Sequence, residues 1–231
     1  MKKGDYSTLQ KAFLYNNKRF SGGKKQIARD EALILNHLLS KNTPGSKIYL
    51  DFGTGTGRAI REILKHNPKK IYALDESVQM LATLRNNFPV EITSNKIQTI
   101  KTKIENIEMK GASVDTVTAL HVLKHIKDTK KVFIRVHHVL KPKGYFIFEV
   151  LNSHSIVRFN LDTCYASNIK DIDKQLKQAG FNIIKTKQIH IFGETIYHLL
   201  WPFSGWLGKL DAMLTRLLPF GTKIFILAQK I

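Results

Sequence analysis

The stretch Ile48-Tyr-Leu-Asp-Phe-Gly-Thr-Gly-Thr-Gly57 decides the fold of this chain. A short run rich in β-forming residues leads through the acidic Asp51 into three glycines at alternate positions. These are Gly53, Gly55 and Gly57, and helix-forming residues follow at once. The order predicts a strand, a tight turn and a helix start, where only glycine lets the backbone approach a ligand closely.

The glycine spacing separates two classes of nucleotide-like ligand. Dinucleotide-binding folds space their glycines as G-x-G-x-x-G and place a pyrophosphate on the helix N-terminus. Here the third glycine comes one residue early, and Asp51 lies two residues before the first. A carboxylate beside the turn would repel a pyrophosphate but would suit a cationic amino group. The turn therefore disfavours NAD.

A second predicted strand, Ile71-Tyr-Ala-Leu-Asp75, ends in an acid. Asp75 follows Gly57 by eighteen residues (75 − 57). A ribose-binding carboxylate is expected at about this place in a βαβ unit. Ser77 then caps a helix that carries Met80.

Five segments resemble the motifs of the class I S-adenosylmethionine-dependent methyltransferases. They run from Asp51 to Gly57, Ala73 to Leu81, Val114 to Ile126, Val139 to Phe148 and Asp171 to Phe181. One such segment would be a weak signal, but five in the family's order are a specific one. The resemblance covers about Lys47 to Lys187 and is faint on either side.

The resemblance implies an α/β fold, with a doubly wound, Rossmann-like sheet of seven strands and helices on both faces. The sheet is expected to be mostly parallel with a last antiparallel strand. The implied cofactor is S-adenosyl-L-methionine. The residues at the cofactor-binding positions are Asp51, Gly53, Thr54, Gly55, Gly57, Asp75, Glu76, Met80, Ile104, Glu105 and Leu120.

One cofactor position departs from the family pattern. Lys103 stands where an acid usually holds the adenine amino group. Glu105 and the backbone of Ile104 are expected to replace that contact.

The alternation of strands and helices predicts a single domain over residues 1–231. Its expected parts are an N-terminal helical cap (1–46), a cofactor-binding core (47–187), an apolar lid-like insert (188–221) and a last strand (222–231). The predicted strands are Ile48–Phe52, Ile71–Leu74, Ile97–Lys101, Thr116–Leu120, Tyr145–Val150, Asn182–Lys187 and Lys223–Ala228.

His121 follows the fourth predicted strand, at the edge of the sheet where the donor methyl is expected. Its ordinary pKa near 6.5 suits a general base for a phenol, enol or hydroxyl acceptor. His125 shares its face one helical turn later and is the second catalytic candidate. The alternative is that both residues only cap or pack a short helix. No carboxylate spacing indicates a metal site, so none is expected.

The segment after the fourth strand also excludes one reaction. Amino-group methylation of adenine or glutamine in this superfamily uses an Asn-Pro-Pro-Tyr-like segment here. This chain has Leu120-His-Val-Leu123 instead.

The predicted insert is rich in aromatic residues. Trp201, Phe203 and Trp206 are the candidates for lining or covering the acceptor pocket, because a connection between the last two strands lies over the ligand-binding edge. The alternative is a helix pair that completes the core.

The formal charge of +19 and the pI of about 10.0 favour a polyanionic partner, either RNA or an anionic membrane surface. The lysines are dispersed, however, and a merely solvated basic surface explains them equally well. One cysteine excludes an internal disulfide. No apolar run reaches the length of a membrane span, so we expect a cytoplasmic protein, at most peripheral to a membrane.

Three functions remain open from the sequence. The favoured one is O- or C-methylation of a small or lipid-like, partly apolar acceptor. The second is RNA methylation, supported chiefly by charge. The third is a non-catalytic protein of the same fold that binds the cofactor.

Overall fold

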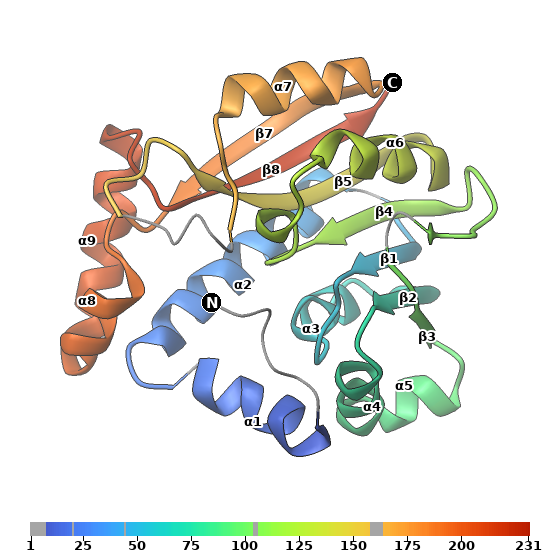
Figure 1. Ribbon diagram of the computed structural model, residues 1–231, viewed down its shortest axis with the longest axis horizontal. Helices are drawn as coiled ribbons and strands as arrows, with labels where there is room; N and C mark the ends of the chain where they lie inside the picture. Colours follow the sequence, from blue (N-terminus) through green and yellow to red (C-terminus); the bar gives the residue numbers. More distant parts are fainter. Residues whose placement is uncertain (1–7, 20, 44, 104–105, 158–163) are drawn as a thin grey trace.

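The computed structural model describes residues 8–19, 21–43, 45–103, 106–157 and 164–231. Its strands form one sheet flanked by helices (Figure 1). The strands are β1 (Ile48–Phe52), β2 (Lys70–Asp75), β3 (Ile97–Lys101), β4 (Val114–Ala119), β5 (Leu140–Asn152), β6 (Ala166–Ser167), β7 (Phe181–Ile189) and β8 (Lys223–Lys230).

The strand order is β3-β2-β1-β4-β5-β8-β7, with the short β6 beside the end of β5. All pairs are parallel except those of β8, which runs antiparallel to both β5 and β7. The predicted doubly wound sheet with a last antiparallel strand is confirmed. β6 is a strand that the sequence did not predict. The order reverses between β1 and β4, and folds of this kind bind ligands at the carboxyl ends of the strands beside such a reversal.

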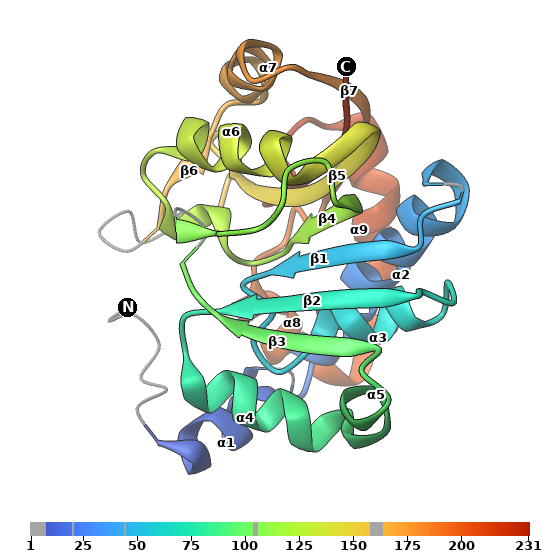
Figure 2. The ribbon, with the colours of Figure 1, turned by 90° about the vertical axis from the view of Figure 1, so that its right-hand side faces the viewer.

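Helices cover both faces of the sheet (Figure 2). They are α1 (Leu9–Arg19), α2 (Lys24–Asn42), α3 (Arg58–Leu64), α4 (Val78–Asn87), α5 (Pro89–Thr93), η2 (Leu123–His125), α6 (Thr129–Val139), α7 (Ile169–Gln178), α8 (Glu194–Leu199), η3 (Trp201–Phe203) and α9 (Ser204–Leu217). Apolar residues of α2, α3 and α4 pack with one face of the strands, and those of α6 and α7 pack with the other.

The central strands are buried along most of their length because both of their faces are covered. Four of the five residues of β1 are buried, and β8 is buried from Lys223 to Ala228. The strands nearest the middle therefore carry few polar side chains. The polar ones that do occur, such as Asp51 and Glu149, need partners inside the protein.

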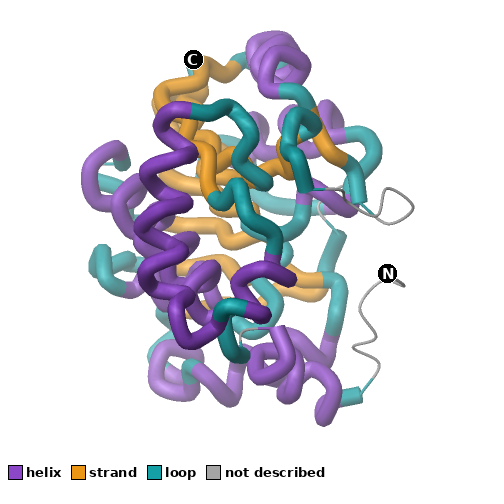
Figure 3. The backbone as a smooth tube through the Cα atoms, turned by 90° about the vertical axis from the view of Figure 1, so that its left-hand side faces the viewer, coloured by secondary structure: helices purple, strands orange, loops and turns teal. Residues whose placement is uncertain are grey.

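The segment between β7 and β8 forms α8, η3 and α9 and lies against α2, as Figure 3 shows from the left-hand side of Figure 1. Ile27 of α2, Tyr197 of α8 and Leu207 of α9 form a small apolar cluster of their own. The contact is close at Gly23, where an added Cβ would lie 1.6 Å from the carbonyl oxygen of Tyr197. Glycine at this position therefore lets α8 rest directly on the start of α2.

Candidate donor and acceptor site

The glycine turn joins β1 to α3 at the carboxyl edge of the sheet. Gly53, Gly55 and Gly57 all have positive φ angles, of 65°, 54° and 90°. An added Cβ would lie 2.1 Å from Val122 at Gly53 and 2.4 Å from Phe88 at Gly57. At Gly55, no atom of the described residues lies within 4 Å of that position. Two of the glycines thus serve packing, while Gly55 presents open backbone, as a ligand-facing turn requires.

Asp51 connects this turn to the sheet. Its side chain is buried, and its two oxygens accept hydrogen bonds from the hydroxyl groups of Thr54 (2.7 Å) and Thr118 (2.5 Å). Burial raises the pKa of Asp51 to about 6, against the lowering effect of the two hydroxyl groups. These bonds join β1, the turn and β4 in one unit, so Asp51 shapes the site from inside the protein.

Asp75 joins the end of β2 to the same turn. Its Oδ2 accepts the backbone N–H of Gly55 (2.8 Å), and its Oδ1 accepts that of Ser77 (2.9 Å). Ser77 caps α4, where its hydroxyl oxygen accepts the N–H of Met80. A carboxylate has about four lone-pair positions, so Asp75 retains acceptor capacity for a ribose hydroxyl.

The remaining predicted cofactor residues fall in different settings. Met80 is buried, and Leu120, directly after β4, is half-buried. Glu76 is exposed. Ile104 and Glu105 lie outside the described residues, so the adenine contact stays a prediction.

His121 follows β4 with a φ of 63°, which a non-glycine residue adopts only under local constraint. The constraint is visible in Glu149 of β5, whose Oε1 accepts the backbone N–H of His121 at 3.0 Å. The same oxygen lies 3.2 Å from Nδ1 of the ring. Nε2 lies 3.0 Å from Oε2 of Glu31 and 3.1 Å from Nη1 of Arg58. We call His121, Glu31, Glu149, Arg58 and Lys223 the His121 cluster.

Two cations complete the cluster. Arg58 and Lys223 both form ion pairs with Glu31, and Nζ of Lys223 lies 4.0 Å from Oε2 of Glu149. Burial opposes ionisation of both carboxyl groups, but His121 and Lys223 beside them hold their pKa values below the ordinary value. Burial lowers the pKa of His121 to about 4, although the two carboxylates act against it. Two negative charges and two positive charges therefore surround a neutral imidazole.

The two ring nitrogens of His121 differ in their contacts. The neutral ring can accept the N–H of Arg58 at Nε2 while its Nδ1–H faces Glu149. A protonated ring can donate from Nε2 to Glu31. Nδ1 lies 3.2 Å from Glu149 but has no hydrogen-bond partner among the described residues.

Glu31, His121 and Glu149 also offer three metal-ligand atoms within 4.8 Å of one another. The charges already present weigh against a divalent cation here. Arg58 and Lys223 occupy the space beside Glu31, so a metal ion would have to displace one of them.

The second catalytic candidate and the predicted acceptor residues are all exposed. His125 lies on η2 and is exposed. Trp201, Phe203 and Trp206 are 60%, 66% and 66% exposed. The lining of an acceptor pocket by these three rings stays a prediction.

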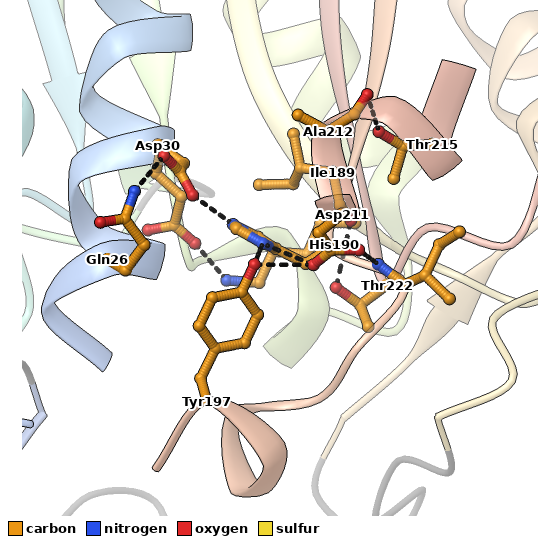
Figure 4. A network of polar contacts seen from close by, with 12 residues as sticks. Gln26, Asp30, Ile189, His190, Tyr197, Asp211, Ala212, Thr215 and Thr222 are labelled. Atoms are coloured by element: carbon orange, nitrogen blue, oxygen red, sulfur yellow. Dashed lines mark hydrogen bonds and ion pairs between the residues drawn. The ribbon is translucent and has the colours of Figure 1, made fainter. Parts of the chain in front are cut away.

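A buried polar network fixes the insert to the sheet (Figure 4). Asp211 of α9 accepts hydrogen bonds from the hydroxyl group of Tyr197 (2.8 Å) and the backbone N–H of Ile191 (2.6 Å). Nδ1 of His190 lies 3.1 Å from the Tyr197 hydroxyl oxygen and 3.2 Å from Asp211. On the other side of the ring, Nε2 lies 3.8 Å from Asp30. Burial and Asp211 raise the pKa of Tyr197, so its hydroxyl group stays a donor.

Asp30 and Glu31 are consecutive on α2 and connect the two networks. The carboxylate of Asp30 lies 3.8 Å from Nε2 of His190, which contacts Asp211 of the insert. The carboxylate of Glu31 contacts the ring of His121. A shift of α2 would therefore move both the insert and the His121 cluster.

Sequence reasoning found His121 but missed the other members of its cluster. They come from four different elements, and Glu31 is ninety residues away from His121 in the chain (121 − 31). One signal was available. Glu149 interrupts the apolar run of β5, and Lys223 begins the apolar run of β8. Charged residues in such central strands need buried partners.

Known proteins match both the sequence and the fold. Residues 50–148 match the profile of a family described as methyltransferase domain. The malonyl-(acyl-carrier protein) O-methyltransferase of Marinomonas sp. strain MWYL1 is 30% identical over 110 residues, which are 47% of this chain and 40% of that protein.

Solved structures share the architecture. An S-adenosylmethionine-dependent methyltransferase from Mesorhizobium loti gives a TM-score of 0.64 at 17% identity, over 84% of this chain and 95% of that one. Phosphoethanolamine N-methyltransferase 2 of Haemonchus contortus, in complex with S-adenosyl-L-methionine, gives 0.69 at 20% identity, over 98% of this chain and 58% of that one.

Residues 50–148 thus match a methyltransferase domain, and the chain has the fold of S-adenosylmethionine-dependent methyltransferases. The domain match supports S-adenosyl-L-methionine as the cofactor, and its binding by the glycine turn and Asp75 stays a prediction. The chain spans 40% of the length of the Marinomonas relative.

Proposed function

We propose that the chain transfers the methyl group of S-adenosylmethionine to an oxygen or carbon atom of a small or lipid-like, partly apolar acceptor. The observation that carries this proposal is His121 beside the glycine turn, with Glu31 3.0 Å from Nε2 and Glu149 3.2 Å from Nδ1. Methyl transfer from a sulfonium is an in-line displacement, so positioning and exclusion of water supply much of the rate. A base is needed in addition where the acceptor loses a proton.

His121 is proposed as that base. The imidazole takes the acceptor proton, and Glu31 and Glu149 then lie beside the two ring nitrogens of the imidazolium. A positioned base contributes typically ~10²–10⁴-fold to such a reaction. Glu149 has a positioning role, because it holds both the backbone and the ring of His121.

The apolar insert supports an apolar acceptor. It is anchored to α2, the helix that also supplies Glu31 to the His121 cluster. A lid-like role of residues 188–221 belongs to this proposal, as does peripheral contact with an anionic membrane in which such an acceptor dissolves. No described helix is both long and apolar enough to cross a membrane.

The test is a methyl-transfer assay with labelled S-adenosylmethionine over separate lipid, metabolite and RNA fractions of the source cell. We expect label in the lipid or small-metabolite fraction. Label in RNA alone, lost steeply with rising salt, would replace this proposal with RNA methylation. Donor binding without transfer to any fraction would favour a non-catalytic protein.

A further inference from the structure

Helices α8, η3 and α9 of the insert expose several large apolar side chains. Leu199 is 78% exposed, Leu217 is 73% exposed and Met213 is 52% exposed, in addition to the three rings. Scattered exposed apolar residues are ordinary on a soluble protein, but contiguous patches mark interaction sites. We call Leu199, Trp201, Phe203, Trp206, Met213 and Leu217 the insert face.

The geometry of α9 divides its residues between two sides. Trp206, Met213 and Leu217 are seven and four residues apart, so they share one side of a helix with 3.6 residues per turn. Leu207 and Asp211 are buried on the opposite side, toward α2 and β7. The exposed stripe is therefore not left over from incomplete packing, because α9 already has a separate buried side.

Basic residues border the apolar stripe. Lys209 and Arg216 are seven residues apart on α9 and are both exposed. Arg216 also lies near Lys187 of β7. The pKa of Lys187 is lowered first by burial and then by the positive charges of Arg216 and Lys185. From residue 195 to residue 231 the only acidic residue is Asp211, and it is buried.

We propose that the insert face docks the protein onto the surface of an anionic lipid bilayer. Helix α9 would lie in the plane of the interface, with Trp206, Met213 and Leu217 among the upper acyl chains and Lys209 and Arg216 at the headgroups. Tryptophan suits this boundary because it is apolar with one polar N–H. Each nearby cation adds attraction to an anionic leaflet.

A second copy of the chain fits the face less well. A two-fold interface brings the same patch of both copies together. In such a dimer, Lys209 and Arg216 of one copy would lie near the same residues of the other copy. These like charges would repel each other, and each copy carries a formal charge of +19. An anionic bilayer meets the apolar and the basic parts of the face at once.

Docking of the insert would also fix the position of the His121 cluster relative to the bilayer. Asp211 and Tyr197 hold the insert together, and Gly23 lets α8 rest on α2, whose Glu31 contacts His121. The docked insert is thus joined through α2 to the His121 cluster. This inference deepens the proposed function by naming the surface from which an acceptor would arrive.

The experiment is vesicle co-sedimentation of the full chain. Vesicles of phosphatidylcholine mixed with phosphatidylserine are compared with phosphatidylcholine alone, at low and raised salt. We expect binding to the anionic vesicles and its loss with salt. The triple variant Trp201→Ala, Phe203→Ala, Trp206→Ala should reduce the partition constant by ~10-fold or more. Lys209→Gln and Arg216→Gln should each reduce it about fivefold, the factor that ~1 kcal/mol per charge gives.

The control is the pair Val90→Ala and Ile134→Ala, which removes exposed apolar side chains from α5 and α6, away from the insert (Figure 1). It should leave vesicle binding unchanged. Equal vesicle binding by the triple variant and the wild type would overturn the proposal. So would a dimer in solution that these variants dissociate, without vesicle binding.

Donor affinity separates this inference from the proposed function. The triple variant should bind S-adenosylmethionine like the wild type, because the three rings are exposed and the change leaves the core intact. Vesicle binding by a chain that transfers no methyl group would contradict the proposed function but would still support the docking surface.

Discussion

At the scale of single residues, the pKa of His121 is lowered and the pKa of Asp51 is raised in the folded chain. The two shifts change the free energy of unfolding with pH in opposite directions. The pKa of His121 is about 4 in the folded chain, below its ordinary 6.5, so the unfolded chain binds more protons between these values. Its contribution to stability is lost as pH falls through that window. The pKa of Asp51 is about 6, above its ordinary 3.8, so its contribution is lost as pH rises from about 3.8 to 6.

The two effects offset each other in the wild type and separate in variants. Between pH 4 and 6, His121→Gln should give a stability curve whose slope against pH lies below that of the wild type. Asp51→Asn should give a slope above it, each by up to about 1.4 kcal/mol per pH unit. Urea unfolding at several pH values measures this. Three parallel curves would contradict the assigned protonation states.

Asp75 carries the donor-binding prediction. Asp75→Ala should weaken S-adenosylmethionine binding by about 1–3 kcal/mol, because hydrogen bonds to a charged group are lost. Calorimetry on the wild type should show binding of the donor and of its demethylated product, and none of NAD. The matched control is Asp173→Ala, a half-buried carboxylate on α7 paired with Lys177. Unchanged donor affinity in Asp75→Ala would remove this residue from the site.

At the scale of elements, the turn between β1 and α3 can be compared with another turn. Gly55 and Gly45 both have positive φ, and no described atom lies within 4 Å of an added Cβ at either. Alanine should cost about 1–2 kcal/mol of stability at both positions from backbone strain. Only Gly55→Ala should also weaken donor binding. Equal donor affinity in the two variants would mean that no ligand lies against Gly55.

The contact between α8 and α2 gives a second element-scale test. Gly23 has helical φ and ψ, so alanine is allowed there by the backbone but would collide with the carbonyl oxygen of Tyr197. Gly23→Ala should speed hydrogen exchange in α8 and α9 while β1 and β4 stay protected. Gly205→Ala on α9, with open space around it, should instead stabilise the helix by roughly 0.5–1 kcal/mol. Slow exchange in both variants would mean that the insert does not depend on this contact.

At the scale of the whole molecule, the sequence predicted what local patterns determine. The motifs run in order through the sheet, so the strand order and the antiparallel β8 were predictable. Strand ends were less so, since β4 begins at Val114 and β5 at Leu140, before the apolar runs predicted there. The His121 cluster was not predictable, because its members meet only after the chain has folded. The degree of exposure of the insert rings was not predictable either, since an apolar stripe does not say which of its sides finds a partner.

The central claim is that His121 takes part in methyl transfer at the glycine turn, and single-turnover transfer by His121→Ala and His125→Ala tests it most directly. With donor and protein premixed, His121→Ala should slow transfer by ~10²-fold or more at unchanged donor affinity. His125→Ala, at the second candidate histidine, should stay within a few-fold of the wild type because His125 is exposed and lies outside the His121 cluster. Transfer by His121→Ala at the wild-type rate, at every pH tested, would contradict the account.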